Sequence, residues 1–408
     1  MDKKRLLFVM NNLHCGGAEK ALVSLLQSLD YAQFEVDLLL FRKEGLFLKQ
    51  VPKTVNLLEA PSEYSYFDMS FLKAILKAFV SFKWPIIWNR IAFTKVYKSE
   101  SHPGIREQKT WKYISASLPK LKGHYDLAVG FLENAPNNYC IEKVSAHYKL
   151  GMIHSDYEAL GLDPQRDLHY FEKFTYVATI SEQCVAVLQR NFTSISNKFI
   201  LLKNITAVQL IHQLAKEPIA FTKSALDLVT IGRLVPLKGF DLLLDAAAQL
   251  KDSGLVFKWY IIGDGPMREE LRQQISHLQL TEQVFLLGLL ENPYPYLEQC
   301  DFYVHTSKYE GKSVAIDEAK ILGKPIIVTN FSTVKDQIIH QQTGWIVEMD
   351  GKAIANAIQF FVENKAITTT LRQQLALEEM TTEGEVEKIV QIAHKGTLLT
   401  LEHKQNEN

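Results

Sequence analysis

Short apolar runs alternate with amphipathic helical stretches along most of this chain. A buried parallel strand reads as a continuous apolar run of about four to eight residues, whereas a covering helix repeats its apolar positions every three or four residues. The runs that we predict as strands are 5–10, 35–41, 126–131, 149–153, 177–181, 199–204, 228–231, 301–306 and 326–329. This alternation predicts an α/β fold in which helices cover the faces of parallel sheets.

The chain is long enough for two such domains. Its 408 residues suffice for two units of roughly 200 residues, each with an ample core. We place the first domain at residues 1–205 and the second at residues 225–384. The stretch between them, 206–224, is polar and weakly patterned, which indicates a linker. Residues 385–408 are predicted to form a helix that ends in a polar tail.

The segment YEGKSVAIDEAKILGKP, residues 309–325, lies between two predicted strands and forms the middle of a βαβ unit. Ser313 is placed to cap a helix over Val314–Leu322, and a glycine and a proline follow as a stop signal. The helix therefore begins directly after a loop that contains Gly311. Its first backbone N–H groups, near Ser313 and Val314, are suited to bind a diphosphate.

Two carboxylates flank this predicted phosphate site. Glu310 lies in the loop before the helix, and Glu318 lies about one turn inside it, on the same face as Val314. Carboxylates repel phosphate, but they accept hydrogen bonds from hydroxyl groups on either side of a diphosphate, as in a nucleotide sugar. The alternative is that Glu318 only complements the helix dipole and that Glu310 is a solvated loop acid.

Two cations flank the loop that follows the predicted strand 228–231. Arg233 can bind phosphate oxygens with its forked guanidinium, and Lys238 can do so as a point charge. Gly263 belongs to a glycine-rich loop after the next apolar run. Either cation, considered alone, could equally be an ordinary surface residue with no role in phosphate binding. Together, and in order before the paired glutamates, they indicate that a diphosphate leaving group is neutralised here.

The first half contributes two further candidate positions. Gly16 and Gly17 open a helix after the first strand, where they allow the backbone to approach a ligand, although a tight strand-to-helix turn explains them as well. They do not form the GxGxxG pattern, which argues against a dinucleotide-dependent dehydrogenase. His154 directly follows a predicted strand, and the carboxyl ends of such strands line the ligand crevice. A structural role is the alternative for His154.

Composition excludes several other classes of protein. Hydrophobic residues make up 47% of the chain and charged residues 22%, and the net charge of −1 argues against a broad nucleic-acid surface. The four cysteines are scattered and predict neither disulfides nor a zinc site, as expected in a reducing cytoplasm. No Asp-x-Asp pair follows a strand, so we expect a reaction without metal or cofactor. We predict neither a signal peptide nor a membrane span.

Between Asp68 and Glu100 the chain contains no acidic residue, and its cations are interleaved with aromatic side chains. This composition is typical of a basic amphipathic surface that lies on anionic lipid. The residues that we expect to contact a membrane or an acceptor are Lys73, Lys77, Lys83, Trp84, Trp88 and Arg90. Pro85 is expected to break the stretch in two. The alternative is a pair of helices packed in the core with a solvated basic face.

These motifs together resemble retaining glycosyltransferases of family 4, whose GT-B fold has two Rossmann-like domains facing across a cleft. The resemblance rests on E-x7-E within 309–325 and extends over residues 225–360. Its other motifs are VTIGRL followed by KG, then IGDGP, VFLLG and TGWIV, in the family's order. The first half matches only at scattered points, and where the family commonly has Asn-Gly this chain has Asn204-Ile205.

The resemblance implies a role for each candidate residue. Gly16 and Gly17 would face the donor diphosphate across the cleft, and His154 would face the transferred sugar. Glu310 would bind sugar hydroxyls and Glu318 the ribose. The β-phosphate itself would help to deprotonate the incoming hydroxyl, because no protein nucleophile is apparent. The first domain would bind the acceptor and the second the nucleotide sugar.

The implied function is transfer of a hexosyl unit from a nucleoside-diphosphate sugar, with a UDP-sugar favoured, to a hydroxyl of a glycan. Family members often use lipid-linked acceptors, so we expect a role in cell-surface polysaccharide synthesis, in the bacterial cytoplasm or on the inner face of the membrane. Two alternatives remain. A catalytically silent partner subunit would be expected to lack some of the motif residues, and a sugar-nucleotide epimerase would leave the basic aromatic stretch without a role.

Overall fold

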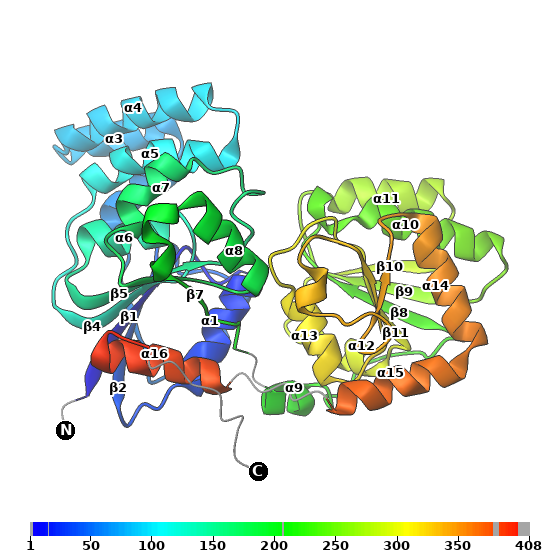
Figure 1. Cartoon of the computed structure of the whole chain (residues 1–408). Helices are drawn as coiled ribbons and strands as arrows, with labels where there is room; N and C mark the ends of the chain where they lie inside the picture. The colour runs from blue at the N-terminus through cyan, green and yellow to red at the C-terminus, as the bar shows by residue number, and fades with distance from the viewer. Residues whose placement is uncertain (1–2, 15, 206–207, 378–382, 399–408) are drawn as a thin grey trace, which may run out of the picture. The chain divides into compact units, whose positions relative to one another are not determined.

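The computed structural model describes residues 3–14, 16–205, 208–377 and 383–398. The chain divides into two compact units. The first unit contains Met1–His14, Leu25–Ile205 and Thr382–Asn408, and the second contains Cys15–Ser24 and Thr206–Thr381. Each unit has its own parallel sheet with helices on both faces (Figure 1). The predicted α/β class is therefore confirmed.

The first unit is built on a seven-stranded sheet in the order β3-β2-β1-β4-β5-β6-β7. All neighbouring strands pair in parallel. The strands are β1 Lys4–Met10, β2 Phe34–Leu40, β3 Asn56–Leu58, β4 Tyr125–Gly130, β5 Ala146–Ile153, β6 Tyr176–Thr179 and β7 Phe199–Leu201. Because the central strands are buried on both faces, they are continuously apolar, which is why the apolar runs located them.

The second unit has a six-stranded parallel sheet in the order β10-β9-β8-β11-β12-β13. Both sheets thus follow the Rossmann order, in which the chain reverses direction across the sheet between the first and fourth strands. The strands are β8 Asp227–Ile231, β9 Lys258–Ile262, β10 Val284–Gly288, β11 Phe302–His305, β12 Ile326–Thr329 and β13 Trp345–Val347. The switch point of this sheet therefore lies between β8 and β11.

Helices separate the strands in both units (Figure 1). Those that precede β8 in the chain are α1 Gly17–Ser28, α2 Ser65–Asp68, α3 Phe71–Val80, α4 Trp84–Ser99, α5 Pro103–Ser117, α6 Ala135–Lys143, α7 Pro164–Phe171, α8 Glu182–Asn191 and α9 Val208–Leu214. Those that follow it are α10 Phe240–Asp252, α11 Arg268–His277, α12 Tyr294–Gln299, α13 Val314–Ile321, α14 Gly351–Glu363, α15 Lys365–Leu377 and α16 Glu383–Lys395.

Of two expectations about the connecting segments, one needs correction and the other is confirmed. The stretch 206–224 is not simply a linker, because it contains helix α9. Ile211 of this helix and Ala215 directly after it are buried in the core of the second unit. The basic aromatic stretch is broken in two near Pro85, as expected, because α3 ends at Val80 and α4 begins at Trp84 after a turn at 81–83. Pro85 lies in the first turn of α4, where a missing N–H breaks no helical hydrogen bond.

The final helix belongs to the first unit. Helix α16 carries the fully or almost fully buried Ile389, Ile392 and Ala393, and the His394 ring lies 5.8 Å from the ring of Phe34 in β2. The chain therefore returns to its first sheet after completing the second unit. Residues 399–408, part of the predicted polar tail, lie outside the described residues.

Candidate functional site

The motifs of the second unit meet at the carboxyl ends of β8 and β11, the two strands at its switch point. Lys238 ends the loop that follows β8, and Glu310 lies in the loop between β11 and α13. In open parallel sheets ligands bind outside the carboxyl ends of strands at a switch point. The sheet order thus brings together two residues that are 72 positions apart in the chain.

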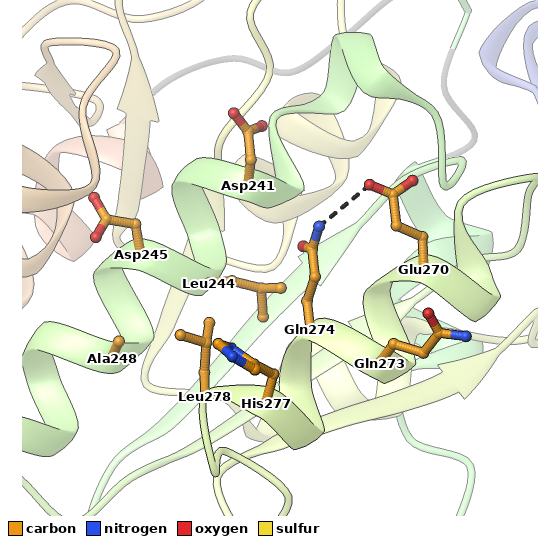
Figure 2. Close-up of a pocket in the computed structure, with 9 residues that line it drawn as sticks. All are labelled: Asp241, Leu244, Asp245, Ala248, Glu270, Gln273, Gln274, His277 and Leu278. Atoms are coloured by element: carbon orange, nitrogen blue, oxygen red, sulfur yellow. Dashed lines mark hydrogen bonds between the residues drawn. The ribbon is translucent and has the colours of Figure 1, made fainter.

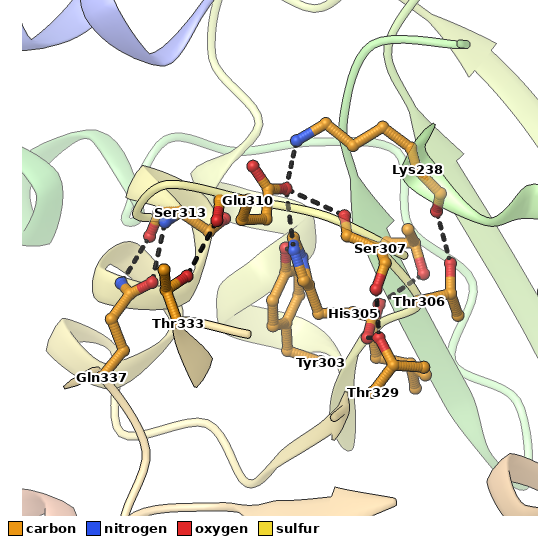
Figure 3. A network of polar contacts seen from close by, with 12 residues as sticks. Lys238, Tyr303, His305, Thr306, Ser307, Glu310, Ser313, Thr329, Thr333 and Gln337 are labelled. Carbon is orange, nitrogen blue, oxygen red and sulfur yellow. Dashed lines mark hydrogen bonds and ion pairs between the residues drawn. The ribbon is translucent and has the colours of Figure 1, made fainter. Parts of the chain in front are cut away.

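One oxygen of the Glu310 carboxylate, Oε1, accepts three hydrogen bonds (Figure 3). The donors are the Lys238 ammonium, with which it also forms an ion pair, His305 Nε2 at 3.1 Å and Ser307 Oγ at 2.8 Å. Within the described part of the chain, the second oxygen, Oε2, has no hydrogen-bond partner. Glu310 is therefore held rigidly through one oxygen and has an acceptor left for a ligand.

The charge of Glu310 follows from these contacts. Burial by itself raises the pKa of this carboxyl, but the Lys238 ammonium and the hydrogen bond from His305 outweigh it and hold the pKa well below its usual range. Glu310 is consequently ionised at neutral pH and can only accept hydrogen bonds. Such a group suits the hydroxyls of a sugar.

His305 is a member of this network that we did not predict from the sequence. Its ring is buried between Tyr303 Oη, 2.9 Å from Nδ1, and Glu310 Oε1, 3.1 Å from Nε2. Because an ionised carboxylate only accepts, Nε2 carries the proton and Nδ1 accepts from the tyrosine hydroxyl. Burial lowers the pKa of His305, so the ring stays neutral. Side chains alternate between the two faces of a strand, so residues 303 and 305 lie on the same face of β11. This alternation is the sequence feature from which the role of His305 could have been predicted.

Three threonine hydroxyls fix the backbone around Glu310 (Figure 3). Thr306 Oγ1 donates to the carbonyl of Lys238 at 2.9 Å, and Thr333 Oγ1 donates to the carbonyl of Glu310 at 2.8 Å. Thr329, at the end of β12, donates to the carbonyl of Ser307 at 2.5 Å. These bonds join the β8, β11 and β12 loops into one unit, which keeps the Glu310 carboxylate in place.

Helix α13 begins as predicted, but its cap differs. Ser313 is the N-cap residue, yet its side chain makes no capping bond. Instead, the Gln337 side chain accepts from the Ser313 N–H at 2.7 Å and donates to the Ser313 carbonyl at 2.8 Å and to Asp317 Oδ1 at 2.9 Å. The Ser313 N–H is therefore not available to a phosphate. The remaining N–H groups of the first turn, beginning at Val314, have no partner within the helix.

Glu318 lies inside α13, one turn beyond Val314, and is 2% exposed. Tyr294 Oη, from α12, donates to its Oε1 at 3.1 Å. The alternative interpretation made Glu310, not Glu318, a solvated loop acid, and the three donors to the largely buried Glu310 side chain argue against it. Gly311 is buried in the loop before the helix.

The glycines near Arg233 and Lys238 are required by close backbone contacts. Gly263, at φ 148°, would place a Cβ 1.9 Å from the carbonyl oxygen of Gly232, and Gly239, at φ 65°, would place one 2.0 Å from that of Thr306. Side chains are therefore excluded where these loops meet. Arg233 itself is exposed and forms no ion pair with a residue that the structure describes, so its guanidinium is accessible.

In the first unit, His154 follows β5 and is 9% exposed. Neither ring nitrogen makes a well-aligned hydrogen bond with a described residue, although the Asn204 side chain and the Phe131 backbone lie close enough to favour the charged ring. The ring lies 5.0 Å from that of Phe131. Burial lowers the pKa of His154 to about 4, so the imidazole is neutral near pH 7. A buried ring without a well-aligned hydrogen bond at either nitrogen is unusual in a structural histidine and keeps a ligand role open.

Two acids beside His154 were missed by the sequence analysis. Glu133 Oε2 accepts from the His154 backbone N–H at 3.1 Å, and Glu107 Oε2 accepts from Asn134 Nδ2 at 2.8 Å. Asn134 adopts φ 62°, an uncommon conformation for a residue with a side chain. Burial raises the pKa of the Glu133 carboxyl, whereas Glu107 is exposed to solvent. Glu133 lies in the loop that follows β4, at a strand end where ligands bind, and from this position the cluster could have been predicted.

The roles of Gly16 and Gly17 stay predictions. Gly17 is the first residue of α1, and Gly16 directly precedes it. In the described ranges no group of three or more His, Cys, Asp or Glu side chains is arranged to hold a metal ion. Likewise, none of the helices in those ranges is long and apolar enough to cross a bilayer.

A surface pocket between α10 and α11 does not coincide with the motif residues (Figure 2). It presents three carboxylates, those of Asp241, Asp245 and Glu270, and none of the predicted donor residues lines it. Gln274 Nε2 donates to Glu270 Oε1 at 3.2 Å across one turn of α11. Such an acidic lining disfavours an anionic diphosphate, so this pocket is not our donor site.

Comparison with known proteins supports the motif assignment. Residues 213–377 match the family model described as glycosyl transferases group 1. A Campylobacter jejuni enzyme, N-acetylgalactosamine-N,N'-diacetylbacillosaminyl-diphospho-undecaprenol 4-alpha-N-acetylgalactosaminyltransferase, is 32% identical over 166 residues, which are 40% of this chain and 44% of that enzyme. Poly(ribitol-phosphate) alpha-N-acetylglucosaminyltransferase of Staphylococcus aureus is 28% identical over 163 residues, 39% of this chain and 33% of the relative. These relatives are thus matched over less than half of their length.

The fold comparison extends over nearly the whole chain. The crystal structure of Anabaena HepE in complex with UDP-glucose superposes with a TM-score of 0.66 at 16% identity, covering 95% of this chain and 98% of that one. Staphylococcus aureus TarM gives a TM-score of 0.66 at 15% identity, covering 96% and 99% of the two chains. The protein therefore shares the GT-B fold of these structures.

Proposed function

Because residues 213–377 of this chain belong to the group 1 glycosyltransferases, we propose that the protein transfers a hexosyl unit from a nucleoside-diphosphate sugar to a glycan hydroxyl. The observation that carries this proposal is the Glu310 carboxylate. It is ionised, held through Oε1 by three donors, and has Oε2 left to accept from a sugar hydroxyl. A UDP-sugar is favoured as the donor, since HepE with the same fold binds UDP-glucose.

The remaining donor contacts follow from the charges around this carboxylate. The exposed Arg233 guanidinium and the N–H groups at the start of α13 would bind the diphosphate, with Lys238 contributing a second cation. An ammonium has three N–H donors, so Lys238 can keep its bond to Glu310 while it contacts phosphate. Glu318 would bind the ribose hydroxyls.

We propose that the anomeric configuration is retained. Negative charge builds up on the diphosphate as it leaves, and preorganised cations and helix N–H groups stabilise that charge in the transition state. Glu310 accepts three hydrogen bonds, one of them from the Lys238 ammonium, and is therefore a weak nucleophile. The β-phosphate would therefore accept the proton of the incoming hydroxyl on the same face of the sugar, while His154 positions the sugar or the acceptor.

The acceptor is proposed to be a glycan carried on a lipid, in the synthesis of a cell-surface polysaccharide. The names of the two relatives support this class, since one acts on a diphospho-undecaprenol-linked sugar and the other on poly(ribitol-phosphate). The enzyme would act on such acceptors in the cytoplasm, at the inner face of the membrane. The cluster of His154, Glu133 and Glu107 in the first unit offers the hydrogen-bonding groups for an acceptor hydroxyl.

Calorimetric titration of nucleotides and nucleotide sugars tests the donor site. We expect one nucleoside diphosphate to bind, and Arg233→Ala and Glu318→Ala to abolish that binding. The matched controls are Arg272→Ala and Glu269→Ala, which remove an exposed ion pair on α11 and should leave binding unchanged. Absence of binding by any nucleotide in folded protein would overturn the proposal and favour a silent partner subunit.

Incubation of the bound UDP-sugar without an acceptor separates transfer from epimerisation. Appearance of a second UDP-sugar in the nuclear magnetic resonance spectrum would identify an epimerase. With a glycan acceptor, the anomeric coupling constant of the product reports whether configuration is retained. An inverted product would contradict the proposed mechanism.

A further inference from the structure

Exposed apolar side chains gather on helices α3 and α4. Of the eighteen large hydrophobic side chains that are exposed in the described residues, ten lie between positions 71 and 97, and the other eight are distributed over residues 237–377. The ten are Phe71, Leu72, Leu76, Phe79, Val80, Phe82, Trp84, Trp88, Ile91 and Tyr97. A concentration of this kind marks an interaction site, because isolated exposed apolar residues need no explanation but contiguous ones do. We call these residues, with Lys73, Lys77, Lys95 and Lys98, the α3–α4 surface.

The helical register places these side chains on continuous stripes. Leu72, Leu76 and Phe79 follow one face of α3 at spacings of four and three, whereas Ala74 and Ala78 on another face are buried. On α4, Trp84, Trp88 and Ile91 form the exposed stripe, and Ile86 and Phe93 are buried on the other side. Figure 1 shows the two helices side by side at the outer edge of the first unit, with α5 next to α4.

The turn between the two helices carries the most exposed of these residues. Phe82 has 79% of its surface exposed and a backbone φ of 53°. That conformation is disfavoured for a bulky residue. Neither packing nor backbone preference explains a phenylalanine at this position, so the residue indicates a partner outside the chain.

The charges on this surface have one sign. Lys73 and Lys77 lie beside the α3 stripe, and Lys95 and Lys98 continue the α4 stripe at the same helical spacing. All four are exposed, and none forms an ion pair with a described residue. No acidic residue occurs between 69 and 99. Within α3, α4 and the turn between them, the apolar stripes are therefore accompanied by cations and by no carboxylate.

Two cations predicted for this contact do not belong to it. Arg90 is buried, and its guanidinium donates to the Met69 carbonyl and to Thr94 Oγ1, each at 2.9 Å. Lys83 forms an ion pair with Glu63 at 2.6 Å. Arg90 therefore stabilises the fold from within, and the charge of Lys83 is neutralised in the first unit.

We propose that the α3–α4 surface docks on an anionic lipid bilayer. Aromatic and aliphatic side chains would enter the headgroup region, and the four exposed lysines would contact lipid phosphates. A second copy of the chain fits less well, because a two-fold interface would place this surface against itself and bring its lysines together. The docking rests on this surface alone and not on the proposed activity, although it would bring a transferase to lipid-linked acceptors.

Sedimentation with vesicles of phosphatidylcholine, alone or mixed with phosphatidylglycerol, tests the proposal. We expect binding only to the mixed vesicles, weakened at high salt, with a blue shift of the tryptophan fluorescence that Trp88→Phe reduces. The double variant Leu76→Glu/Trp88→Glu should abolish binding to the vesicles. Each lysine near such a surface strengthens binding by about fivefold, so Lys95→Glu with Lys98→Glu should weaken it more than about 25-fold.

Matched controls separate docking from folding. Val256→Glu also adds a charge at an exposed apolar position, and Lys120→Glu with Lys122→Glu reverses two exposed lysines elsewhere in the first unit. Both should bind vesicles like the unaltered protein, and all variants should give the same circular dichroism. Equal binding by the α3–α4 variants and the controls would overturn the proposal. Absence of vesicle binding would also overturn the proposal. This holds if the protein is a monomer, and equally if it forms a dimer that Leu76→Glu disrupts.

Discussion

The loop around Glu310 and the α3–α4 surface depart from ordinary burial in opposite directions. Around Glu310, ionic and polar side chains are largely withdrawn from water but satisfied by Lys238, His305 and the surrounding hydroxyls. On α3 and α4, large apolar side chains remain in water with no partner in the fold. Each departure lowers stability relative to the usual arrangement. We therefore propose that binding, in addition to folding, constrains the sequence in these two regions.

The largest effect is expected at Glu310. Glu310→Gln keeps the shape of the side chain but removes the charge that the Lys238 ammonium stabilises. Removing one preorganised electrostatic contact costs about 100- to 1,000-fold in catalytic rate, so we expect a loss of that size in sugar transfer. Glu269→Gln on α11 is the control. Activity within a factor of two of the unaltered enzyme would show that the Glu310 network is structural only.

Substitutions on opposite faces of α4 sharpen the contrast between buried and exposed positions. Phe93 is buried, with its ring 5.2 Å from that of Phe67, and Phe93→Ala should lower the free energy of unfolding by about 3 kcal/mol. Trp88 is 71% exposed, and Trp88→Ser should change it by less than about 0.5 kcal/mol. Urea denaturation measures both. A similar cost at the two positions would mean that Trp88 packs in the fold.

His154 is buried, and its lowered pKa predicts how the free energy of unfolding depends on pH. The pKa is about 4 in the folded chain and 6.5 in the unfolded reference, so the unfolded chain binds more protons between these values. Its contribution to stability is fully present above pH 6.5 and is lost as pH falls towards 4. The expected loss is about 3 kcal/mol in the free energy of unfolding.

Thermal denaturation at several pH values measures this effect in His154→Gln and in the control His277→Gln, which alters an exposed histidine of α11. The His154 variant should lose much of the decrease below pH 6.5, and the control should retain it. An unchanged decrease in the His154 variant would assign the acid sensitivity to other groups.

Among the buried positions, the smallest loss of stability is expected at Gln337. Gln337→Ala removes the three hydrogen bonds that connect its side chain to Ser313 and Asp317. It leaves buried polar groups without partners, which should cost about 2 kcal/mol in the free energy of unfolding. Gln341→Ala, at a nearby exposed position, serves as the control. Equal stability of the two variants would show that water replaces the Gln337 contacts.

Much of the fold could be predicted because local patterns carry it. The apolar runs identified β1, β8 and β12 within one residue at each end, and the predicted start of α13 at Val314 is correct. The prediction failed for α9 within the supposed linker. Its seven residues are too few for a clear helical period, and packing of Ile211 and Ala215 against the second core stabilises the helix.

The candidate site was predictable only in part. Glu310, Lys238 and Glu318 stood out because their spacing follows a family pattern. His305 did not stand out, because a histidine within an apolar strand cannot be distinguished from an ordinary core residue until its hydrogen-bond partners are known. The Gln337 cap was also beyond prediction, because nothing in the local pattern relates that glutamine to a helix N-terminus 24 residues earlier.

The sequence by itself determined the alternation of strands and helices, the positions of the motifs and the cationic, aromatic composition of residues 69–99. These depend on neighbours within a few positions. Only the tertiary structure decided that Lys238 pairs with Glu310, that Gln337 occupies the Ser313 N–H, and that Arg90 turns inward while Trp88 stays in water. Each of these outcomes depends on which surfaces pack together across many positions of the chain, and burial and partner choice are properties of that packing.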